Sequence, residues 1–169
     1  MPSVLSYRLL TPEKEMLMSS AVVTEGITEE HLKEVYSDPY ITKVGHDHRP
    51  AAPIHHPNVT YLSAWVGEVF AGAFLVIKQS AVELELHALL KRSALKYSRM
   101  LGIQCLSWAF SRQILRVTAY IIEGLTSAKN YCLKLGFKYE GCRRSACVKD
   151  GKILNVDILG MTREEWSAI

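Results

Sequence analysis

The segment 115–152 constrains the fold of this chain more than any other. Residues 115–123 carry apolar side chains at every second position, which predicts a strand with one buried face. A helix is predicted over 126–135, and two further strands meet at Asp150-Gly151, a dipeptide that favours a tight hairpin. The segment therefore predicts a strand, a helix and a hairpin in that order. The buried face of the first strand is expected to be Leu115, Val117, Ala119 and Ile121.

Both ends of the predicted helix carry residue types that favour helix boundaries. Thr126 or Ser127 can serve as the N-cap, because a hydroxyl accepts a hydrogen bond from a free N–H group of the first turn. Gly136 follows the last helical residue, and glycine adopts a left-handed turn at low cost. A short helix with a sharp end is therefore expected.

The rest of the chain supplies further predicted elements. A helix over 98–110 has a wide apolar stripe for packing on a sheet. Alternation predicts a strand over 81–89, with acidic residues and a histidine on one face. Other expected elements are strands at 3–10, 59–66 and 69–78, a helix from Pro12 to about Ser20, and a helix from Thr28 to before Pro39. The apolar stripe is Leu101, Ile103, Cys105, Leu106, Trp108 and Phe110, and the apolar face of strand 81–89 is Val82, Leu84, Leu86 and Ala88.

Length and composition favour one globular domain. The chain has 169 residues, of which 49% are hydrophobic and 22% charged, and its formal net charge is +3. This charge is too small to indicate nucleic-acid binding, and no apolar run approaches the ~18 residues that span a bilayer. We therefore expect neither a membrane nor a specific nucleic acid among its partners. Residues 1–10 lack the apolar core of a secretory signal, and the cysteines lack zinc-site spacing, so reduced thiols in a cytoplasmic protein are expected.

Several short sequences in the last third occur in a familiar order. They are Ser127-Ala128, Leu135-Gly136-Phe137-Lys138-Tyr139-Glu140-Gly141, Arg143-Arg144, Asp150-Gly151-Lys152 and Gly160-Met161-Thr162-Arg163-Glu164-Glu165-Trp166. In this order they resemble the C-terminal half of the GNAT acyltransferase superfamily over about residues 83–166. The likeness is greatest to the branch that acetylates protein N-termini or antibiotics and to the GNAT-like proteins of tailed phages.

The resemblance implies an α/β (α+β) fold: one GNAT-type domain over residues 1–169, with a mixed, mostly antiparallel sheet flanked by helices. Residues 1–58 would supply the first strand, helices and a loop, and residues 59–169 the sheet core with the cofactor region. The implied activity is acetyl-CoA-dependent N-acyl transfer, directly to an amine of a small molecule or a protein. In this family the cofactor lies in a gap between two strands, and its pyrophosphate sits at a helix N-terminus.

The expected cofactor loop departs from the family pattern. Family loops contain glycines, which let the backbone approach the phosphates, whereas the matching segment Lys91–Tyr97 contains none. Basic side chains either compensate through direct phosphate contacts or are only solvated cations. The resemblance assigns cofactor contacts to Leu89, Leu90, Lys91, Arg92, Ala94, Leu95, Lys96, Tyr97, Ser98 and Arg99.

Two other family positions also differ. Leu125 replaces a common asparagine, and Cys132 replaces a tyrosine that protonates the departing CoA thiolate. A thiol can donate that proton, or Cys132 can be a small core residue. The angle between neighbouring helix positions turns Cys132 away from Tyr131, which favours the cofactor side.

A general base is needed to take the proton of the acceptor amine. His87 is the first candidate, because histidine changes its protonation state near neutral pH, and Glu85 is the second. Both share one strand face with Glu83. The alternative is that this face is exposed to solvent or covered by a helix.

Residues 41–58 are rich in proline and histidine. His46, Asp47 and His48 can be read as metal ligands, or the segment can be a stiff loop that covers the acceptor cleft. We expect the loop and no metal, because neighbouring loop histidines rarely form a closed site. The family places its acceptor cleft beside this part of the chain.

The departures at Lys91–Tyr97, Leu125 and Cys132 favour a second function class. A GNAT fold without catalysis can serve as a binding or assembly module, such as a phage head or virion-associated protein. Its partners would be virion proteins or further copies of the chain, and its location the host cytoplasm or the virion. Binding of acetyl-CoA separates the two classes.

Overall fold

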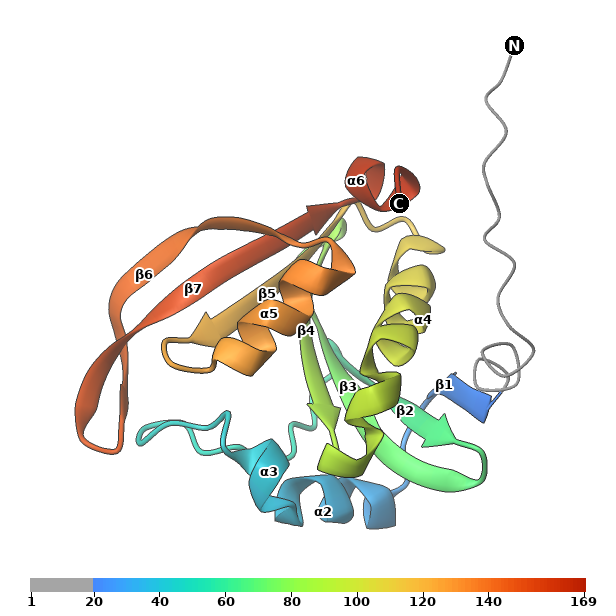
Figure 1. Cartoon of the computed structure of the whole chain (residues 1–169), viewed down its shortest axis with the longest axis horizontal. Coiled ribbons are helices and arrows are strands. Elements are labelled where there is room, and N and C mark those ends of the chain that lie inside the picture. The colour runs from blue at the N-terminus through green and yellow to red at the C-terminus, as the bar shows by residue number, and fades with distance from the viewer. Residues whose placement is uncertain (1–19) are drawn as a thin grey trace.

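A seven-stranded sheet with helices on both faces forms the body of the molecule (Figure 1). The computed structural model describes residues 20–169. Neighbouring strands are antiparallel except for the parallel pair β4–β5, and their order is β1-β2-β3-β4-β5-β7-β6. The predicted single α/β domain with a mostly antiparallel sheet is therefore confirmed. The strands are β1 (Ala21–Glu25), β2 (Val59–Val66), β3 (Val69–Lys78), β4 (Glu83–Leu90), β5 (Arg116–Ile122), β6 (Lys138–Lys149) and β7 (Lys152–Thr162).

The helices pack on the sheet in two groups. Helices α4 and α5 bury one large apolar cluster against one face, and α2 and α3 bury a smaller cluster against the other. Within residues 20–169 no helix combines the length and apolar character needed to cross a bilayer. The helices are α2 (Glu29–Ser37), α3 (Pro39–Thr42), the 3₁₀-helix η1 (Arg92–Tyr97), α4 (Ser98–Phe110), α5 (Thr126–Leu135) and α6 (Arg163–Ser167).

Helix boundaries follow the local residue types in most places. The hydroxyl of Thr28 accepts a hydrogen bond from the N–H of His31 at 3.1 Å, and α2 ends before Pro39, as predicted. Gly136 adopts a left-handed conformation with φ of 102° at the end of α5. The predicted N-cap of α5 is wrong, because Leu125 occupies that position and makes no side-chain capping bond.

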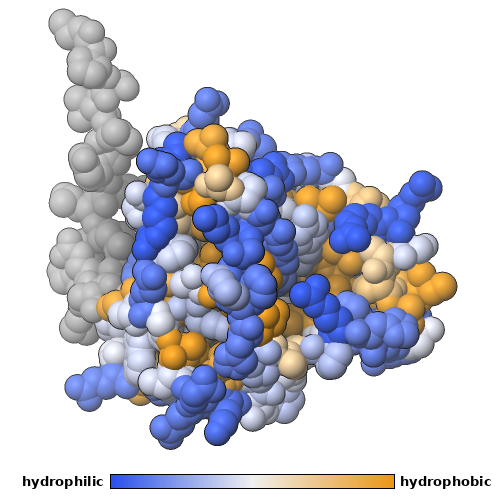
Figure 2. Space-filling model, turned by 180° about the vertical axis from the view of Figure 1, so that it is seen from behind, coloured by the Kyte–Doolittle hydropathy of each residue, from blue (hydrophilic) through white to orange (hydrophobic). Residues whose placement is uncertain are grey.

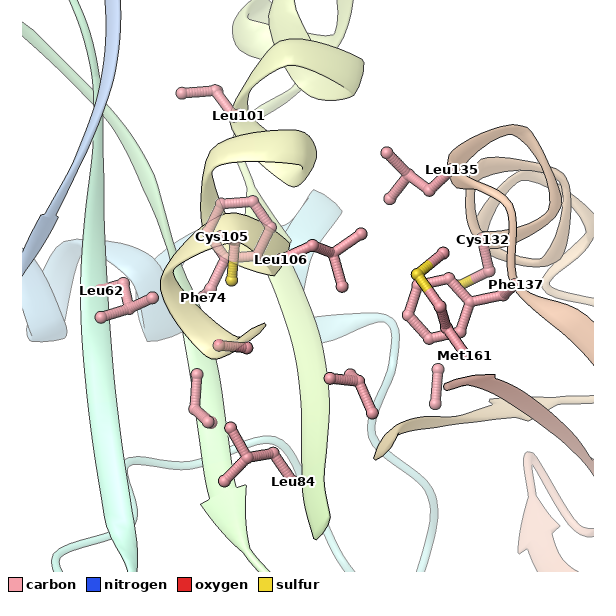
Figure 3. Close-up of a cluster of buried hydrophobic side chains, with 14 of the residues drawn as sticks. Leu62, Phe74, Leu84, Leu101, Cys105, Leu106, Cys132, Leu135, Phe137 and Met161 are labelled. Atoms are coloured by element: carbon pink, nitrogen blue, oxygen red, sulfur yellow. The ribbon is translucent and has the colours of Figure 1, made fainter. Parts of the chain in front are cut away.

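The larger core lies under α4. Figure 3 shows α4 residues Leu101, Cys105 and Leu106 beside Leu62 and Phe74 of the sheet. The predicted stripe is confirmed for most of its residues, but Ile103 is 41% exposed. Two predictions for neighbouring strands are also wrong: Leu115 precedes β5 and is 52% exposed, and Val82 precedes β4 and is 43% exposed.

Strand β1 pairs with β2 in a place where no strand was predicted. Its sequence Ala21-Val22-Val23-Thr24 contains β-branched residues, which favour strands and were the available signal. The outer edge of β1 is covered by Gln104 of α4, which accepts from the N–H of Val23 at 2.9 Å and donates to the carbonyl of Ala21 at 2.7 Å. The predicted strand at 3–10 and the helix after it fall outside the described residues.

The hairpin formed by β6 and β7 projects from the sheet as a curved arm (Figure 1). Its turn is Asp150-Gly151, with φ of 51° and 73°, as the dipeptide predicts. Seen from behind, hydrophobic side chains gather on this arm between hydrophilic ones, and Ile153 is 67% exposed (Figure 2).

A polar network joins the sheet at the point where β4 meets β5. Thr118, which is 1% exposed, donates to Glu83 at 2.6 Å and accepts from Arg116 at 3.0 Å. The guanidinium of Arg116 also holds both carboxylate oxygens of Glu140 on β6. The network therefore ties β4, β5 and β6 together over Gly160 of β7, where a side chain would collide with Glu140.

The pair Arg116–Glu140 predicts a pH-dependent contribution to stability. The hydrogen bond from Arg116 lowers the pKa of Glu140, and the charge of Arg116 adds to this against the effect of burial. A carboxyl with a lowered folded-state pKa stabilises the fold above its unfolded-state pKa and loses that contribution as pH falls through the folded value. We expect Glu140→Gln to lower the free energy of unfolding by about 1 kcal/mol at neutral pH, since the pair is partly exposed.

Urea unfolding across a pH series measures this effect. The two proteins should converge in stability at acidic pH, where Glu140 is protonated in both states. A stability difference that stays constant down to acidic pH would contradict the assignment.

Candidate active site between strands β4 and β5

A gap opens inside the sheet where β4 and β5 diverge. The two strands share only three residue pairs within the described chain, the last being Glu85 with Thr118, and then separate (Figure 1). The N–H of Lys91 bonds the carbonyl of Ala71 on β3 at 3.0 Å. Since backbone groups alternate in direction along a strand, Leu86, Ala88 and Leu90 direct theirs toward the gap.

Ala88 is exposed on the face of β4 that packs against α4. Leu84 and Leu90 lie on the same face of β4 and are 6% and 5% exposed, whereas Ala88 between them is exposed. The apolar face predicted for this strand is therefore interrupted at Ala88. At Ala88 the sheet continues only on the β3 side, where Ala88 pairs with Phe74, because β5 has already diverged.

The start of α4 lies at the end of β4, beside the gap. The predicted cofactor segment forms η1, which runs into Ser98, the first residue of α4. Leu89 is buried against the opposite face, and Ala94 is 2% exposed. Arg92, Leu95, Lys96 and Arg99 are exposed, and the ammonium of Lys96 lies 4.9 Å from the ring of Tyr97.

The charge of Lys91 is engaged elsewhere. Its ammonium binds the carboxylate of Glu34 on α2 and donates to the carbonyl of Phe70 at 3.1 Å. It therefore differs from Arg92 and Arg99, whose guanidinium groups make no ion pair or side-chain hydrogen bond with residues 20–169.

The two candidate bases lie together on the face of β4 opposite α4. Nε2 of His87 is 2.6 Å from a carboxylate oxygen of Glu85, and the amide of Gln79 donates to the other oxygen at 2.5 Å. The side chain of His87 is 31% exposed and that of Glu85 is 14% exposed. This arrangement orients the imidazole while leaving its other nitrogen, Nδ1, outside the contact with Glu85.

The carboxyl of Glu85 is held in its charged form. Burial raises its pKa, but the hydrogen bond and charge of His87, the hydrogen bond from Gln79 and the charge of Arg49 outweigh burial. The net result is a pKa below the usual value for glutamate. Glu85 is therefore a carboxylate at neutral pH and suits the role of orienting His87 better than that of a base.

Residues 43–50 reach the tip of the β6–β7 hairpin (Figure 1). The carboxylate of Asp47 accepts the N–H groups of Asp150 and Gly151, both at 2.9 Å, and these bonds lower its pKa. The ammonium of Lys149 donates to the carbonyls of Lys43 and Gly45. We call these contacts the clasp.

Asp47, one of the three candidate metal ligands, instead takes part in the clasp. Asp47 faces backbone N–H groups, and no group of three or more potential metal ligands comes together within the described residues. The loop of residues 41–58 is also attached further along, where the hydroxyl of Tyr61 accepts the N–H of Ile54 at 3.0 Å.

The structure places Cys132 in the core, so the expectation that it faces the cofactor side is wrong. Its side chain lies beside Phe137 and Met161, and the residue is 8% exposed (Figure 3). Burial raises the pKa of its thiol to about 11. The hydroxyl of Tyr131 instead reaches the start of α4, where it donates to the carbonyl of Ser98 at 2.8 Å.

Thiol labelling should distinguish Cys132 from an exposed cysteine. Cys142 is exposed, whereas Cys132 is buried and holds its proton tightly, so a thiol reagent should label Cys142 rapidly and Cys132 only after unfolding. Mass spectrometry of labelled peptides measures the rate of labelling at each cysteine. Rapid labelling of Cys132 in the folded protein would contradict its place in the core.

Cys132→Tyr should lower the free energy of unfolding by about 1–3 kcal/mol, because the larger side chain overpacks the core.

Gln79 and Arg49 were not singled out from the sequence. Gln79 follows β3 and meets Glu85 only after the chain has turned into β4. Arg49 lies in the loop, and its positive charge helps to lower the pKa of Glu85. Neither contact leaves a periodic pattern in the sequence.

Solved structures with this fold are found among acetyltransferases. A mutant of the spermidine N-acetyltransferase SpeG from Vibrio cholerae matches with a TM-score of 0.75 over 88% of this chain and 97% of that chain, at 11% identity. The same enzyme in complex with CoA and spermine matches with a TM-score of 0.75 over 88% and 99%, also at 11% identity. No family model and no curated protein matches the sequence. The chain therefore has the fold of GNAT acetyltransferases, and at this identity the likeness concerns the fold alone.

Proposed function

We propose that the chain is an acetyl-CoA-dependent N-acyltransferase that transfers an acetyl group directly to an amine. The gap between β4 and β5 carries the proposal. Its inner edge presents backbone groups of Ala88 and Leu90 that no strand pairs within the described residues, since the last pair of β4 with β5 is Glu85 with Thr118. An extended chain with amide groups, such as the pantetheine arm of CoA, can bond to such an edge as an added strand would.

The phosphates of the cofactor would lie at the start of α4. A helix N-terminus favours anions, and Arg92, Lys96 and Arg99 add exposed positive charge there. Because η1 contains no glycine, we assign more of the phosphate binding to side chains than in the family pattern. Leu90 would contribute backbone contacts to the pantetheine arm, whereas the backbone groups of Leu89 point toward β3.

The Glu85–His87 pair would prepare the acceptor. His87 takes a proton from the amine, Glu85 holds the imidazole, and the amine nitrogen attacks the thioester carbonyl. The new C–N bond forms and the C–S bond breaks, which releases the CoA thiolate. With Cys132 in the core, we assign the proton that the thiolate takes up to solvent.

Calorimetry with acetyl-CoA tests cofactor binding. We expect micromolar binding by the unmodified chain and at least about ten-fold weaker binding by the double variant Lys96→Ala, Arg99→Ala, since charged hydrogen bonds contribute about 1.5–3 kcal/mol each. Affinity should also fall with added salt, because exposed charges are screened.

Arg144→Ala is the matched control, because Arg144 is an exposed cation on β6. It should bind acetyl-CoA as the unmodified chain does. An unchanged dissociation constant in the double variant would remove Lys96 and Arg99 from the site, and no binding at millimolar cofactor would reject the enzyme.

A non-catalytic module is the second candidate. The observation that favours it is the glycine-free cofactor segment, which is wound into η1 and has Lys91 engaged by Glu34. Such a module would bind other proteins, for example in a phage particle or in the host cytoplasm. Absence of acetyl-CoA binding in the same calorimetry would favour it.

A further inference from the structure

The turn between β3 and β4 fixes the backbone of Gln79 beside the candidate base. Gln79 follows the last residue of β3, and its N–H donates to the carbonyl of Glu83 at 3.0 Å. The hydroxyl of Ser80 accepts the N–H groups of Val82 and Glu83 at 3.2 and 3.1 Å. These bonds hold the backbone of Gln79 in place next to the start of β4.

Three side chains form a series of hydrogen bonds that begins in this turn. The amide of Gln79 donates to Oε2 of Glu85 at 2.5 Å, and Oε1 of the same carboxylate lies 2.6 Å from Nε2 of His87. Two contacts on separate oxygens fix the plane of the carboxylate, which a single contact would leave free to rotate. The side chain of Gln79 thus sets how Glu85 meets the imidazole.

The amide of Gln79 suits this task because it carries no charge. A lysine or arginine in its place would neutralise Glu85. With a neutral donor, the negative charge of Glu85 remains available to stabilise His87 once the imidazole has gained a proton. An amide therefore fixes the carboxylate without weakening its attraction for the imidazolium.

The same contacts determine which imidazole nitrogen can act as the base. An ionised carboxylate only accepts hydrogen bonds, so Nε2 of His87 must carry the proton that it shares with Glu85. In the neutral imidazole the other nitrogen, Nδ1, then holds the free electron pair. Nδ1 makes no hydrogen bond with residues 20–169, so no group in this part of the chain competes with an amine for it.

We propose that Gln79 is a positioning residue for the transfer: through Glu85 it holds His87 in the tautomer with a proton on Nε2, so that Nδ1 takes the proton of the acceptor amine. This inference rests on the proposed function. During transfer Nδ1 gains the amine proton while Nε2 keeps its own, and Glu85 stabilises the resulting imidazolium. Loss of the proton on Nδ1 to solvent restores the neutral ring.

Heteronuclear NMR of the imidazole nitrogens tests the tautomer without an acceptor. The spectrum is recorded at mildly alkaline pH, where imidazole is neutral, and the signals of His87 are identified by their loss in His87→Gln. We expect only Nε2 of His87 to be protonated in the unmodified chain and a mixture of both tautomers in Gln79→Leu. A proton on Nδ1 in the unmodified chain, or an unchanged spectrum in Gln79→Leu, would overturn the inference.

Kinetics with acetyl-CoA and the amines propylamine, benzylamine and spermidine test the effect on the reaction. With the best of these amines, Gln79→Leu should lower kcat at least about ten-fold, the scale of one hydrogen bond to a charged group. The KM for acetyl-CoA should not change, because Gln79 precedes the start of β4 and the cofactor segment follows its end. Gln79→Glu keeps the size of the side chain but replaces the donor by a second carboxylate, and should lower kcat at least as much.

Ser80→Ala is the matched control. It removes a hydroxyl that supports the same turn but makes no contact with Glu85, so the tautomer and kcat should stay as in the unmodified chain. Equal losses of kcat in Ser80→Ala and Gln79→Leu would assign the effect to the turn and overturn the inference, while the proposed function would stand. Absence of transfer to all of these amines, with no acetyl-CoA binding by calorimetry, would overturn both.

Discussion

Replacement of His87 by glutamine should lower kcat for acetyl transfer by about 10²–10⁴-fold, the range typical of a positioned general base. Glutamine keeps a group that can hydrogen-bond to Glu85 but cannot accept the proton of the amine. The side chain lies on the face of β4 opposite α4, away from the proposed phosphate site. Steady-state kinetics at saturating acetyl-CoA measure the rate, and calorimetry should show unchanged cofactor affinity.

The pH dependence of the rate distinguishes the role of His87 as the base from the role of Glu85 in orienting it. The rate of the unmodified chain should fall at acidic pH, because a base that already holds a proton cannot accept one from the amine, and this fall should disappear in His87→Gln. Glu85→Gln should slow the reaction but keep a low-pH fall, because His87 remains. A His87→Gln variant with the same rate and the same profile would transfer the role of base to Glu85 or to water.

Periodic segments of the sequence predicted their elements well. Strands β2 and β3 and helices α4 and α5 begin and end where the patterns and boundary residues place them. Their apolar patterns are regular, β2 and β3 meet at the turn Gly67-Glu68, and α5 ends at Gly136, so local information suffices there even though neither α4 nor α5 begins with a side-chain capping bond. Strand β1 is short and irregular in burial, and its pairing with β2 and with Gln104 depends on distant residues.

The errors in the predicted site arose because the burial of a residue depends on neighbours that its local sequence pattern does not reveal. Alternation placed Ala88 on a buried face, but burial there depends on β5, which diverges from β4. Cys132 was judged by its angle from Tyr131, whereas its three-residue spacing from Leu135 puts both on one helix face. Leu135 is 6% and Cys132 8% exposed, so they enter the same core.

The pair Glu85 and His87 could be selected from alternation alone, because both lie on one strand. The clasp could not, because it joins segments about a hundred residues apart, as in the bond from Asp150 to Asp47. Tertiary contacts of this kind leave no pattern within either segment.

Replacement of Gly72 by alanine should lower the free energy of unfolding by about 3–5 kcal/mol and weaken acetyl-CoA binding. Gly72 lies on β3 opposite Leu90, with φ of 124°, a conformation that side chains disfavour. A Cβ there would collide with the carbonyl oxygen of Leu89 and lie 2.8 Å from Cα of Leu90. These atoms are backbone, so the end of β4 must move.

Gly67→Ala is the control for Gly72→Ala, because it introduces the strain of a side chain at positive φ without a steric collision. Gly67 also has a positive φ, 59°, but a Cβ there meets no atom within 4 Å, so only about 1–2 kcal/mol should be lost. Because Leu90 leads directly into Lys91 and η1, Gly72→Ala should also disturb the cofactor segment, and Gly67→Ala should not. Urea unfolding and calorimetry measure both effects. Equal losses of stability in the two variants would show that the close approach of β3 to the end of β4 does not limit residue 72 to glycine.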